Sequence, residues 1–577
     1  MNPYGIDFGT TNSVLAQWNG HEVEVLSIDS PPGEWEQLGF DKVMPSVVGV
    51  SQDGRRTTFG WAAKRQQEGK LETVKRLFAT EEFVDIGGSR VSVEEAAALL
   101  FGHLRSASAG VEVDRAVVTI PANSRGLARY RTKLCAGLAG IDVQALVNEP
   151  TAAAMAYAVD ARRDQNILVF DWGGGTLDVT VLETIEGVFI ERASKGIPRS
   201  GGIDLDEAFA LAIRNRLPRR PSWSPGQEAQ FRLEVERAKI LLSSQEETNL
   251  RLPDGEYVQV DRVLFEKSIG KLLEEARQPI LQCLRDLQIG PGGIDQLVMV
   301  GGSSKIPAAR KLVSETVGRE PATGCDPMTA VAEGAAIASA ILLGQLDKDF
   351  FVSTEHALGT IVHNDNQRPE FSVLIPRNRQ LPARESDNYI PAVQGQRSVL
   401  VRVIEGDPAK EVSDPDNVVL KEWSIDVDPD LTQQENAFDI SYEYNVDGIL
   451  HITVTNTRTG RVMLRDDVSF GVTKDKSQLI NLATRVRTTI ESGGGPAGSA
   501  TPAPVATATA PAPAPALDSA TVHLLERARN KVVPFVGEDE GQRLEALCSD
   551  LERSVGAASD ECREALERKL RQYAYLF

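Results

Sequence analysis

The chain has only five cysteines among its 577 residues, and no two of them form a C-x-x-C pair. This scarcity argues against a disulfide framework and against a structural zinc site, and it fits a reducing compartment. Basic residues are also in deficit, because Lys and Arg total 62 against 82 Asp and Glu, for a formal charge of −20. Such a charge repels phosphate backbones and anionic lipids, so we expect neither a nucleic acid nor a membrane surface as a partner.

Long apolar runs are missing as well. The longest one near a predicted helix, residues 335–343, is only nine residues long and contains Ser339, whereas a membrane-spanning helix needs about 20 apolar residues. The first residues, MNPYGIDFGTTN, have no basic stretch followed by an apolar one, so we expect no export signal. These absences predict a cytoplasmic protein.

What is present indicates several folded domains, since 41% of the residues are hydrophobic and 25% are charged. Residues 1–345 alternate apolar strands with longer helical patterns, which predicts an α/β domain. Residues 355–475 contain short runs rich in β-branched residues between turn signals, which predicts an antiparallel β-sandwich. Residues 398–406 and 448–456 are the clearest of these strands.

The C-terminal part has a different composition. Residues 492–516 are Gly, Pro, Ala, Ser and Thr with one Val, and six prolines interrupt them, so they predict a disordered tether. Residues 476–491 begin a helical region, and residues 517–577 predict a small helical domain in which Leu544, Leu551 and Leu566 lie on apolar faces. Ser559 and Asp560 supply an expected N-cap before Glu561.

The most informative feature is an internal echo of one motif. YGIDFGTTNSVLA at residues 4–16 and ILVFDWGGGTLDVTVL at residues 167–182 are both predicted hairpins in which an apolar strand ends in an acid and a Gly/Thr turn follows. Glycines let backbone N–H groups approach phosphate oxygens, and hydroxyls add donors. Two facing acids, Asp7 and Asp171, are what a hydrated Mg²⁺ between two phosphates needs. The turn residues that we expect to bind phosphate are Gly9, Thr10, Thr11, Gly173, Gly174, Gly175 and Thr176.

A third glycine-rich segment, LVMVGGSSKIP at residues 297–307, runs from an apolar strand into a predicted helix beginning at Pro307. Turns of this kind hold nucleotides by backbone contacts. The chain has neither the G-x-x-x-x-G-K-[ST] motif nor the G-x-G-x-x-G fingerprint, so neither a P-loop enzyme nor a Rossmann dehydrogenase is supported.

With these motifs assembled, the chain resembles the 70-kDa heat-shock chaperone family of the DnaK type, within the actin/hexokinase-like ATPase superfamily. The resemblance covers about residues 4–475. It rests on IDFGTTNS, NEPTAAAMAY, FDWGGGTLDV, VERAKILLSS and VGGSSKIP in that order, and on FSVLIPRNRQLP and FDISYEYNVDGILHI in the predicted sandwich. It implies an actin-like ATPase domain at 1–345, an apolar linker at 346–354, a peptide-binding β-sandwich at 355–475 and a lid-like helical domain at 517–577.

The resemblance also implies roles for individual residues. Lys75, Glu149, Asp171 and Thr176 match the catalytic group that stabilises the transferred phosphate and orients the attacking water. The implied nucleotide contacts, beyond the turn residues above, are Asn12, Gly201, Gly202, Glu236, Lys239, Ser243, Gly301, Gly302, Ser303 and Lys305. The implied cofactors are ATP or ADP with Mg²⁺, held through water by Asp7 and Asp171, with K⁺ as a further candidate.

The resemblance also implies residues that connect the nucleotide site to the linker and residues that bind peptide. Pro121, Arg129, Phe350 and Phe351 match the relay between nucleotide site and linker, and Tyr389, Ala392, Val399 and Val401 match the region of the peptide channel. For Val399 and Val401 the sandwich core is nearly as good an interpretation. Unfolded or extended polypeptides are the implied partners.

Departures from the family pattern weaken the expectation of co-chaperones. Ala145 stands where the family commonly presents an arginine to a J-domain partner, and the span 75–117 is short, as is the hairpin after Asn249 where an exchange factor would bind. The leading interpretation is an ATPase that binds and releases extended apolar segments. Two alternatives stay open, a nucleotide-gated scaffold or sensor with little turnover and a small-molecule kinase of the same superfold.

Overall fold

The structure is a computed structural model. It describes residues 2–576 except 52–55, 79, 108–112, 123, 125, 159–163, 186–187, 219–220, 348–353, 355, 365, 367, 378, 416, 446–449, 469–475, 493–520, 522–523, 526 and 555–556. Phe350 and Phe351, expected in the linker, lie outside the described residues, as does most of the expected tether.

The first half of the chain forms two lobes. Lobe I consists of β1 (Tyr4–Phe8), β2 (Asn12–Trp18), β3 (Val23–Leu26), α1 (Gly33–Glu36), β4 (Met44–Pro45), β5 (Val48–Val50), β6 (Thr57–Phe59), α2 (Gly60–Lys64), β7 (Lys70–Leu71), η1 (Val74–Leu77), β8 (Phe83–Ile86), β9 (Ser89–Ser92), α3 (Val93–Ala107), β10 (Arg115–Ile120), α4 (Gly126–Leu138), β11 (Asp142–Asn148), α5 (Glu149–Ala158) and α11 (Ala330–Leu342).

Lobe II lies between α5 and α11 in the sequence. It consists of β12 (Gln165–Trp172), β13 (Leu177–Ile185), β14 (Val188–Ile197), α6 (Gly202–Arg216), α7 (Pro225–Leu242), β15 (Glu247–Arg251), β16 (Tyr257–Asp261), α8 (Arg262–Ser268), α9 (Gly270–Asp286), η2 (Pro291–Gly293), β17 (Gln296–Val300), η3 (Gly302–Lys305) and α10 (Pro307–Val317). Residues 262–286 form two helices, α8 and α9, and the first is capped by Asp261, whose Oδ1 accepts from Leu264 N at 2.6 Å.

The two lobes repeat one sheet topology, as the echoed motif predicts. In lobe I the strand order is β11-β10-β1-β2-β3, and in lobe II it is β17-β12-β13-β14. In both, the first hairpin is antiparallel (β1 with β2, β12 with β13), and a parallel strand joins its first member on the other side (β10 and β17). The two hairpin turns therefore occupy equivalent places in their sheets.

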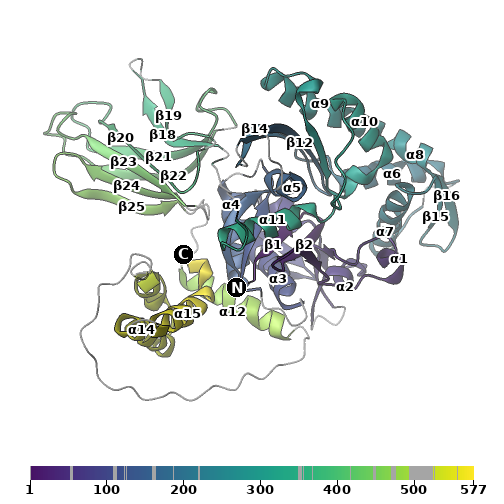
Figure 1. The fold of residues 1–577 in the computed structure, drawn as a ribbon, viewed down its shortest axis with the longest axis horizontal. Coiled ribbons are helices and arrows are strands. Elements are labelled where there is room, and N and C mark those ends of the chain that lie inside the picture. Colours follow the sequence, from purple (N-terminus) through teal and green to yellow (C-terminus); the bar gives the residue numbers. More distant parts are fainter. Residues whose placement is uncertain are drawn as a thin grey trace.

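The β-sandwich follows the two lobes in the sequence and lies at the upper left in Figure 1. Its elements are β18 (Ala357–His363), β19 (Pro369–Ile375), β20 (Ala383–Tyr389), β21 (Ser398–Gly406), β22 (Val418–Asp426), β23 (Phe438–Tyr444), β24 (Leu450–Asn456) and β25 (Val462–Val468). They form two antiparallel sheets, β19-β18-β21-β22 and β20-β23-β24-β25. The Tyr442 hydroxyl of one sheet donates to the Gly359 carbonyl of the other at 2.8 Å, so the predicted sandwich is present.

The C-terminal helices lie beside lobe I in Figure 1. They are α12 (Lys476–Ser492), η4 (Arg527–Val532, a π-helical turn), η5 (Val533–Phe535), α14 (Glu538–Arg553), α15 (Ala557–Arg571) and η6 (Ala574–Leu576). Leu544, Leu551 and Leu566 are buried, as predicted from their periodicity. The predicted N-cap at residues 559–560 is wrong, because α15 already begins at Ala557 and both residues lie inside its first turn.

No helix in the described part of the chain is long and apolar enough to cross a membrane. All five cysteines are free thiols.

Candidate functional site

The turns of the two repeated hairpins face each other and interlock. A Cβ atom on Gly174 would lie 2.2 Å from Thr11 Oγ1, so the second turn reaches the first with no space for a side chain. A Cβ on Gly201 would lie 2.4 Å from the Gly174 carbonyl carbon, which brings the start of α6 against the same turn. Only glycine fits at such approaches. The structure thus brings together the two turns that the sequence predicted to bind phosphate.

Buried acidic side chains gather beside these turns. Asp7 and Asp171 end β1 and β12, and Glu149 begins α5. Burial, together with the charge of Glu149, raises the pKa of Asp7 to about 7, even though Lys75 and a hydrogen bond from the Thr119 hydroxyl (3.2 Å) favour its charged form.

The pKa of Asp171 is raised well above its usual range, first by burial and then by the nearby carboxylates Glu149, Asp178 and Asp7. The one lysine of this cluster, Lys75, donates from Nζ to Glu149 Oε1 at 2.7 Å. When all of these carboxyl groups are ionised, their negative charge exceeds the positive charge of Lys75. A bound cation would supply what is missing.

The cation that fits is a hydrated one. Among the residues that the structure describes, no three His, Cys, Asp or Glu side chains are arranged to hold a metal ion directly. Mg²⁺ usually keeps several waters and binds through one or two carboxylates together with substrate phosphates. Asp7 and Asp171, on opposite lobes, suit that manner of binding.

A cavity of about 820 Å³ opens beside the turns, between the lobes. Its size lies within the range of about 300–1,000 Å³ that is typical of small-molecule sites. Ten of the predicted nucleotide residues line it, namely Thr11, Asn12, Gly174, Gly202, Glu236, Lys239, Ser243, Gly302, Ser303 and Lys305. The three predicted segments of the site, far apart in sequence, thus meet in one place.

Two ion pairs line the wall of this cavity. Lys64 of α2 pairs with Glu236 of α7 at 2.8 Å, and Lys239 pairs with Asp206 of α6 at 2.7 Å. Burial raises the pKa of Asp206 to about 6, although Lys239 opposes the rise. The pKa of Glu236 is lowered instead, because the charges of Lys64 and Lys239 outweigh the effect of its burial.

Sequence reasoning missed Lys64 and Asp206. Neither belongs to a glycine-rich motif, and their partners lie on other elements, so only the fold reveals them. The ammonium of Lys64 also lies beside two aromatic rings, with Nζ 5.3 Å from the Trp35 ring centre and 5.5 Å from that of Trp61.

Arg76 was missed as well, although it adjoins Lys75. It donates to the Gly175 carbonyl of lobe II and pairs with Asp204 at 3.0 Å. Asp204 in turn accepts from the Gly201 backbone N–H at 2.7 Å. One arginine of lobe I therefore joins the second turn to the N-terminus of α6.

The third glycine-rich segment completes the cavity. It runs from β17 through η3 into α10, which begins at Pro307 as predicted. The Ser303 hydroxyl donates to the Gly173 carbonyl at 3.1 Å, and Lys305 pairs with Asp326 at 2.7 Å.

Of the predicted relay residues, Phe350 and Phe351 lie outside the described residues, and Pro121 directly follows β10. Arg129 of α4 is buried, and its charge acts on Glu191 of β14. Glu191 Oε1 accepts from Arg377 of the sandwich at 2.7 Å, and Oε2 accepts from the Asn148 amide at 3.2 Å. Burial raises the pKa of Glu191 against the effect of Arg377. Sequence reasoning missed this pair because it joins segments 186 residues apart.

Of the predicted peptide-channel residues, Tyr389 and Val399 are half-buried and Ala392 is exposed. Val401 is only 2% exposed and belongs to the apolar core of the sandwich, which favours the core interpretation that the sequence left open for it. Residues 399 and 401 point to the same face of β21, and Val399 packs against the same core from a more exposed position.

Comparisons with known proteins agree with this geometry. The family model described as Hsp70 protein matches residues 79–477. The chain is 34% identical to the chaperone protein DnaK of Thermus thermophilus over 507 residues, covering 79% of each chain. It is 32% identical to the chaperone protein DnaK of Cenarchaeum symbiosum over 478 residues, covering 79% of this chain and 71% of the relative. It is 31% identical to the chaperone protein DnaK of Metamycoplasma hominis over 479 residues, covering 79% and 78%.

Proposed function

The chain belongs to the Hsp70 family of ATP-dependent molecular chaperones, and we propose that it hydrolyses ATP where its two hairpin turns meet and couples hydrolysis to peptide binding by its β-sandwich. Members of this family are ATPases that bind nucleotide with Mg²⁺ and bind unfolded polypeptides. The observation that carries the assignment of the site is the cluster of buried carboxylates around one lysine, beside a cavity of nucleotide size.

Each residue of that cluster has a role in the proposal. Bound Mg²⁺, held through water by Asp7 and Asp171, would neutralise phosphate charge. Lys75 stabilises the charge that develops on the transferred phosphoryl group, and Glu149 holds Lys75 in position through their 2.7 Å pair. Asp171 and the hydroxyl of Thr176 orient the attacking water. Phosphoryl transfer needs mainly such positioning and charge neutralisation, so this set is chemically sufficient.

The wall of the cavity suits the rest of the nucleotide. We propose that Glu236, Lys239 and Ser243 contact the ribose and base, because all three line the cavity from the last turns of α7. Gly302, Ser303 and Lys305 line it from η3. A site for K⁺ is also part of the proposal, on the family resemblance alone.

We propose that residues 355–475 bind extended peptides, with Tyr389, Ala392 and Val399 in the channel. The Tyr389 hydroxyl shares a hydrogen bond of 3.1 Å with Ser372, which orients its ring at one end of β20. Pro121 and Arg129 would relay the nucleotide state to the linker at 346–354. The pair between Arg377 and Glu191 supports such a relay, because it joins the sandwich to lobe II next to Arg129.

We also propose partners and a cellular location for the chain. Extended polypeptides are the proposed clients. A J-domain partner is less well supported, because Ala145 is fully buried in β11 and offers it no side chain. An exchange factor would meet a hairpin, β15–β16, of only five residues a strand. Free thiols suit a reducing compartment, so we propose the cytoplasm.

Steady-state ATP hydrolysis by the full chain, measured with a series of extended peptides of rising apolar content, tests this function. A chaperone should be stimulated by apolar peptides and not by a charged peptide of equal length. Hydrolysis that ignores every peptide would favour the nucleotide-gated scaffold, and phosphate transfer to a small molecule would favour the kinase.

A further inference from the structure

Two successive carbonyl groups of the second hairpin turn accept hydrogen bonds at the start of α6. The Gly173 carbonyl accepts from the Gly202 backbone N–H at 2.9 Å and from the Ser303 hydroxyl at 3.1 Å. The Gly174 carbonyl accepts from the Ile203 N–H at 3.0 Å. Gly202 and Ile203 are the first two residues of α6, so the turn lies with these carbonyls against the start of the helix.

Arg76 of lobe I binds the third carbonyl of the same turn. Its Nη2 donates to the Gly175 carbonyl and also to Asp204 Oδ2 at 3.0 Å. Because Asp204 lies in the first turn of α6, this nitrogen lies on the same side of the hairpin turn as the two helix amides. The side chains of Arg76 and Asp204 are only 22% and 21% exposed, so water competes weakly for the contact.

The positions of the three carbonyls fix the directions of three amides. A trans peptide group is planar, and its C=O and N–H bonds point in opposite directions. The N–H groups of Gly174, Gly175 and Thr176 therefore point away from α6. Successive N–H groups on one side of such a turn form a concave site for an anion. A carbonyl that turned to that side would repel the anion instead.

The start of α6 is itself bonded to the residue before the turn. The Trp172 indole N–H donates to the Ser200 carbonyl at 2.6 Å, and the indole is fully buried beside Phe170. The following amide, Gly201 N–H, points the other way and donates to Asp204 Oδ2 at 2.7 Å. The strand that leads into the turn thus also fixes the helix against which the turn lies.

We propose that Arg76 and Trp172 are positioning residues for phosphate binding. Arg76 keeps the Gly175 carbonyl turned away from the phosphates, and Trp172 holds the helix start that does the same for the carbonyls of Gly173 and Gly174. This inference rests on the proposed nucleotide site and adds the means by which the turn is arranged before the nucleotide binds. A turn that is already ordered loses less conformational entropy on binding, so it binds phosphate more tightly.

Calorimetric titration of the full chain with adenosine and with ADP and Mg²⁺ tests the proposal, because only ADP carries phosphates. Trp172→Phe removes the indole N–H and keeps an aromatic ring in the core, so we expect it to weaken ADP binding about tenfold. Arg76→Met removes a charged donor and should weaken ADP binding about 10- to 100-fold. Adenosine, which has no group for the turn to bind, should bind both variants within about twofold of the wild type.

The matched controls remove the same kinds of hydrogen bond elsewhere in the chain. Trp423→Phe takes an indole donor from Asp466 in the sandwich, where the two atoms are 2.9 Å apart. Arg319→Met takes a guanidinium donor from the Ile294 carbonyl, 3.0 Å away in lobe II. Both controls should bind adenosine and ADP as the wild type does.

Asp204→Asn separates positioning from a simple attraction between Arg76 and the phosphates. If only charge mattered, removal of a carboxylate near the phosphates would strengthen ADP binding. If Asp204 holds Arg76 and the Gly201 amide in place, the same change should weaken ADP binding and leave adenosine binding unchanged. Tighter or equal binding of ADP by Asp204→Asn would overturn the proposed role of Arg76.

The remaining outcomes are equally decisive. ADP binding within about twofold of the wild type in Arg76→Met or in Trp172→Phe would overturn the role of that residue. An equal loss of adenosine and ADP binding would overturn it too, because a general loss of structure acts on both ligands. A wild type that binds ADP no more tightly than adenosine would contradict the proposed nucleotide site itself, so the two failures are distinguishable.

Discussion

Replacing Lys75 by alanine should nearly abolish ATP turnover and leave nucleotide binding in place. The Lys75 ammonium lies 2.7 Å from Glu149, and their side chains are only 10% and 12% exposed, so its charge acts in a poorly solvated site. Losing one electrostatic donor from such a site lowers kcat about 10²–10³-fold, or about 2.7–4 kcal/mol of transition-state stabilisation. The change leaves untouched the cavity wall, which we propose binds the nucleoside.

The same variant should lose stability for a reason that can be separated from catalysis. Removing one partner of a buried ion pair costs about 3–5 kcal/mol, because the other charge is left uncompensated. Glu149 would then face Asp7 and Asp171 with no cation nearby. The double variant Lys75→Ala/Glu149→Gln removes that charge, so it should regain most of the free energy of unfolding and still turn over slowly.

The assay is single-turnover hydrolysis together with calorimetric nucleotide binding and denaturant unfolding of each variant. Lys271→Ala is the control, because that lysine is 88% exposed and its pair with Glu275 is a surface one. Turnover by Lys75→Ala within about threefold of the wild type would refute the catalytic assignment. So would a double variant that recovers turnover together with stability.

Three further predictions concern other parts of the molecule. Gly201→Ala should weaken ATP binding about 5- to 150-fold, since overpacking against the Gly174 backbone costs about 1–3 kcal/mol. Gly33→Ala, which meets no atom within 4 Å, should leave binding unchanged, and equal affinities of the two variants in calorimetry would contradict the interlocked turns. The hydrogen bond with Asp467 raises the pKa of His451 above 6.5, so the stability that this histidine contributes is complete below pH 6.5 and is lost as pH rises through the raised pKa. The free energy of unfolding of His451→Gln should therefore approach that of the wild type with rising pH. A difference between the two proteins that stays constant with pH would contradict this titration. Val399→Phe should reduce the affinity for a fluorescent apolar peptide without changing basal ATP hydrolysis, and unchanged peptide affinity would assign the side chain to the sandwich core.

The local parts of this site could be predicted from sequence. A strand that ends in an acid and a glycine-rich turn is a short-range pattern, so the two hairpins at Asp7 and Asp171 and the helix beginning at Pro307 were found where expected. The duplicated topology follows from the same echo, because equal motifs occupy equal places in the two sheets.

Contacts across the cleft could not be predicted in this way. Lys64 with Glu236, and Arg76 with Asp204, join elements more than 120 residues apart, and ordinary charged residues on helices carry no sign of their partners. The sequence left Val399 and Val401 open between the peptide channel and the sandwich core, because alternation alone does not tell the mouth of a sandwich from its core, and the structure buries Val401.

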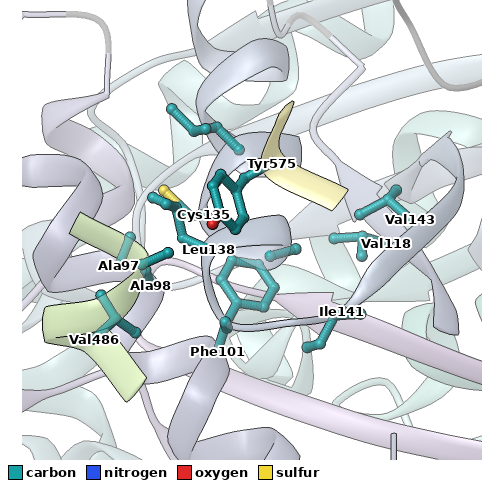
Figure 2. Close-up of a cluster of buried hydrophobic side chains, with 14 of the residues drawn as sticks. Ala97, Ala98, Phe101, Val118, Cys135, Leu138, Ile141, Val143, Val486 and Tyr575 are labelled. Carbon is teal, nitrogen blue, oxygen red and sulfur yellow. The ribbon is translucent and has the colours of Figure 1, made fainter. Parts of the chain in front are cut away.

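The C-terminal helices illustrate a further limit. A helical tail after a predicted tether suggests a lid, and that role of residues 517–577 stays a prediction. Only the surroundings of Gly137 reveal that the end of this tail packs on lobe I, because the close approach of two backbones has no sequence pattern. Figure 2 shows the Tyr575 ring there, beside Cys135 and Leu138 of α4.

The central claim is that the two turns and their opposed aspartates bind a magnesium nucleotide, and calorimetric titration of the full chain with ATP tests it most directly. We expect binding that requires Mg²⁺, weakens when the metal is chelated, and weakens by a similar factor in Asp171→Asn with Mg²⁺ present. Absence of heat with the wild type, or binding that neither chelation nor Asp171→Asn alters, would contradict the claim.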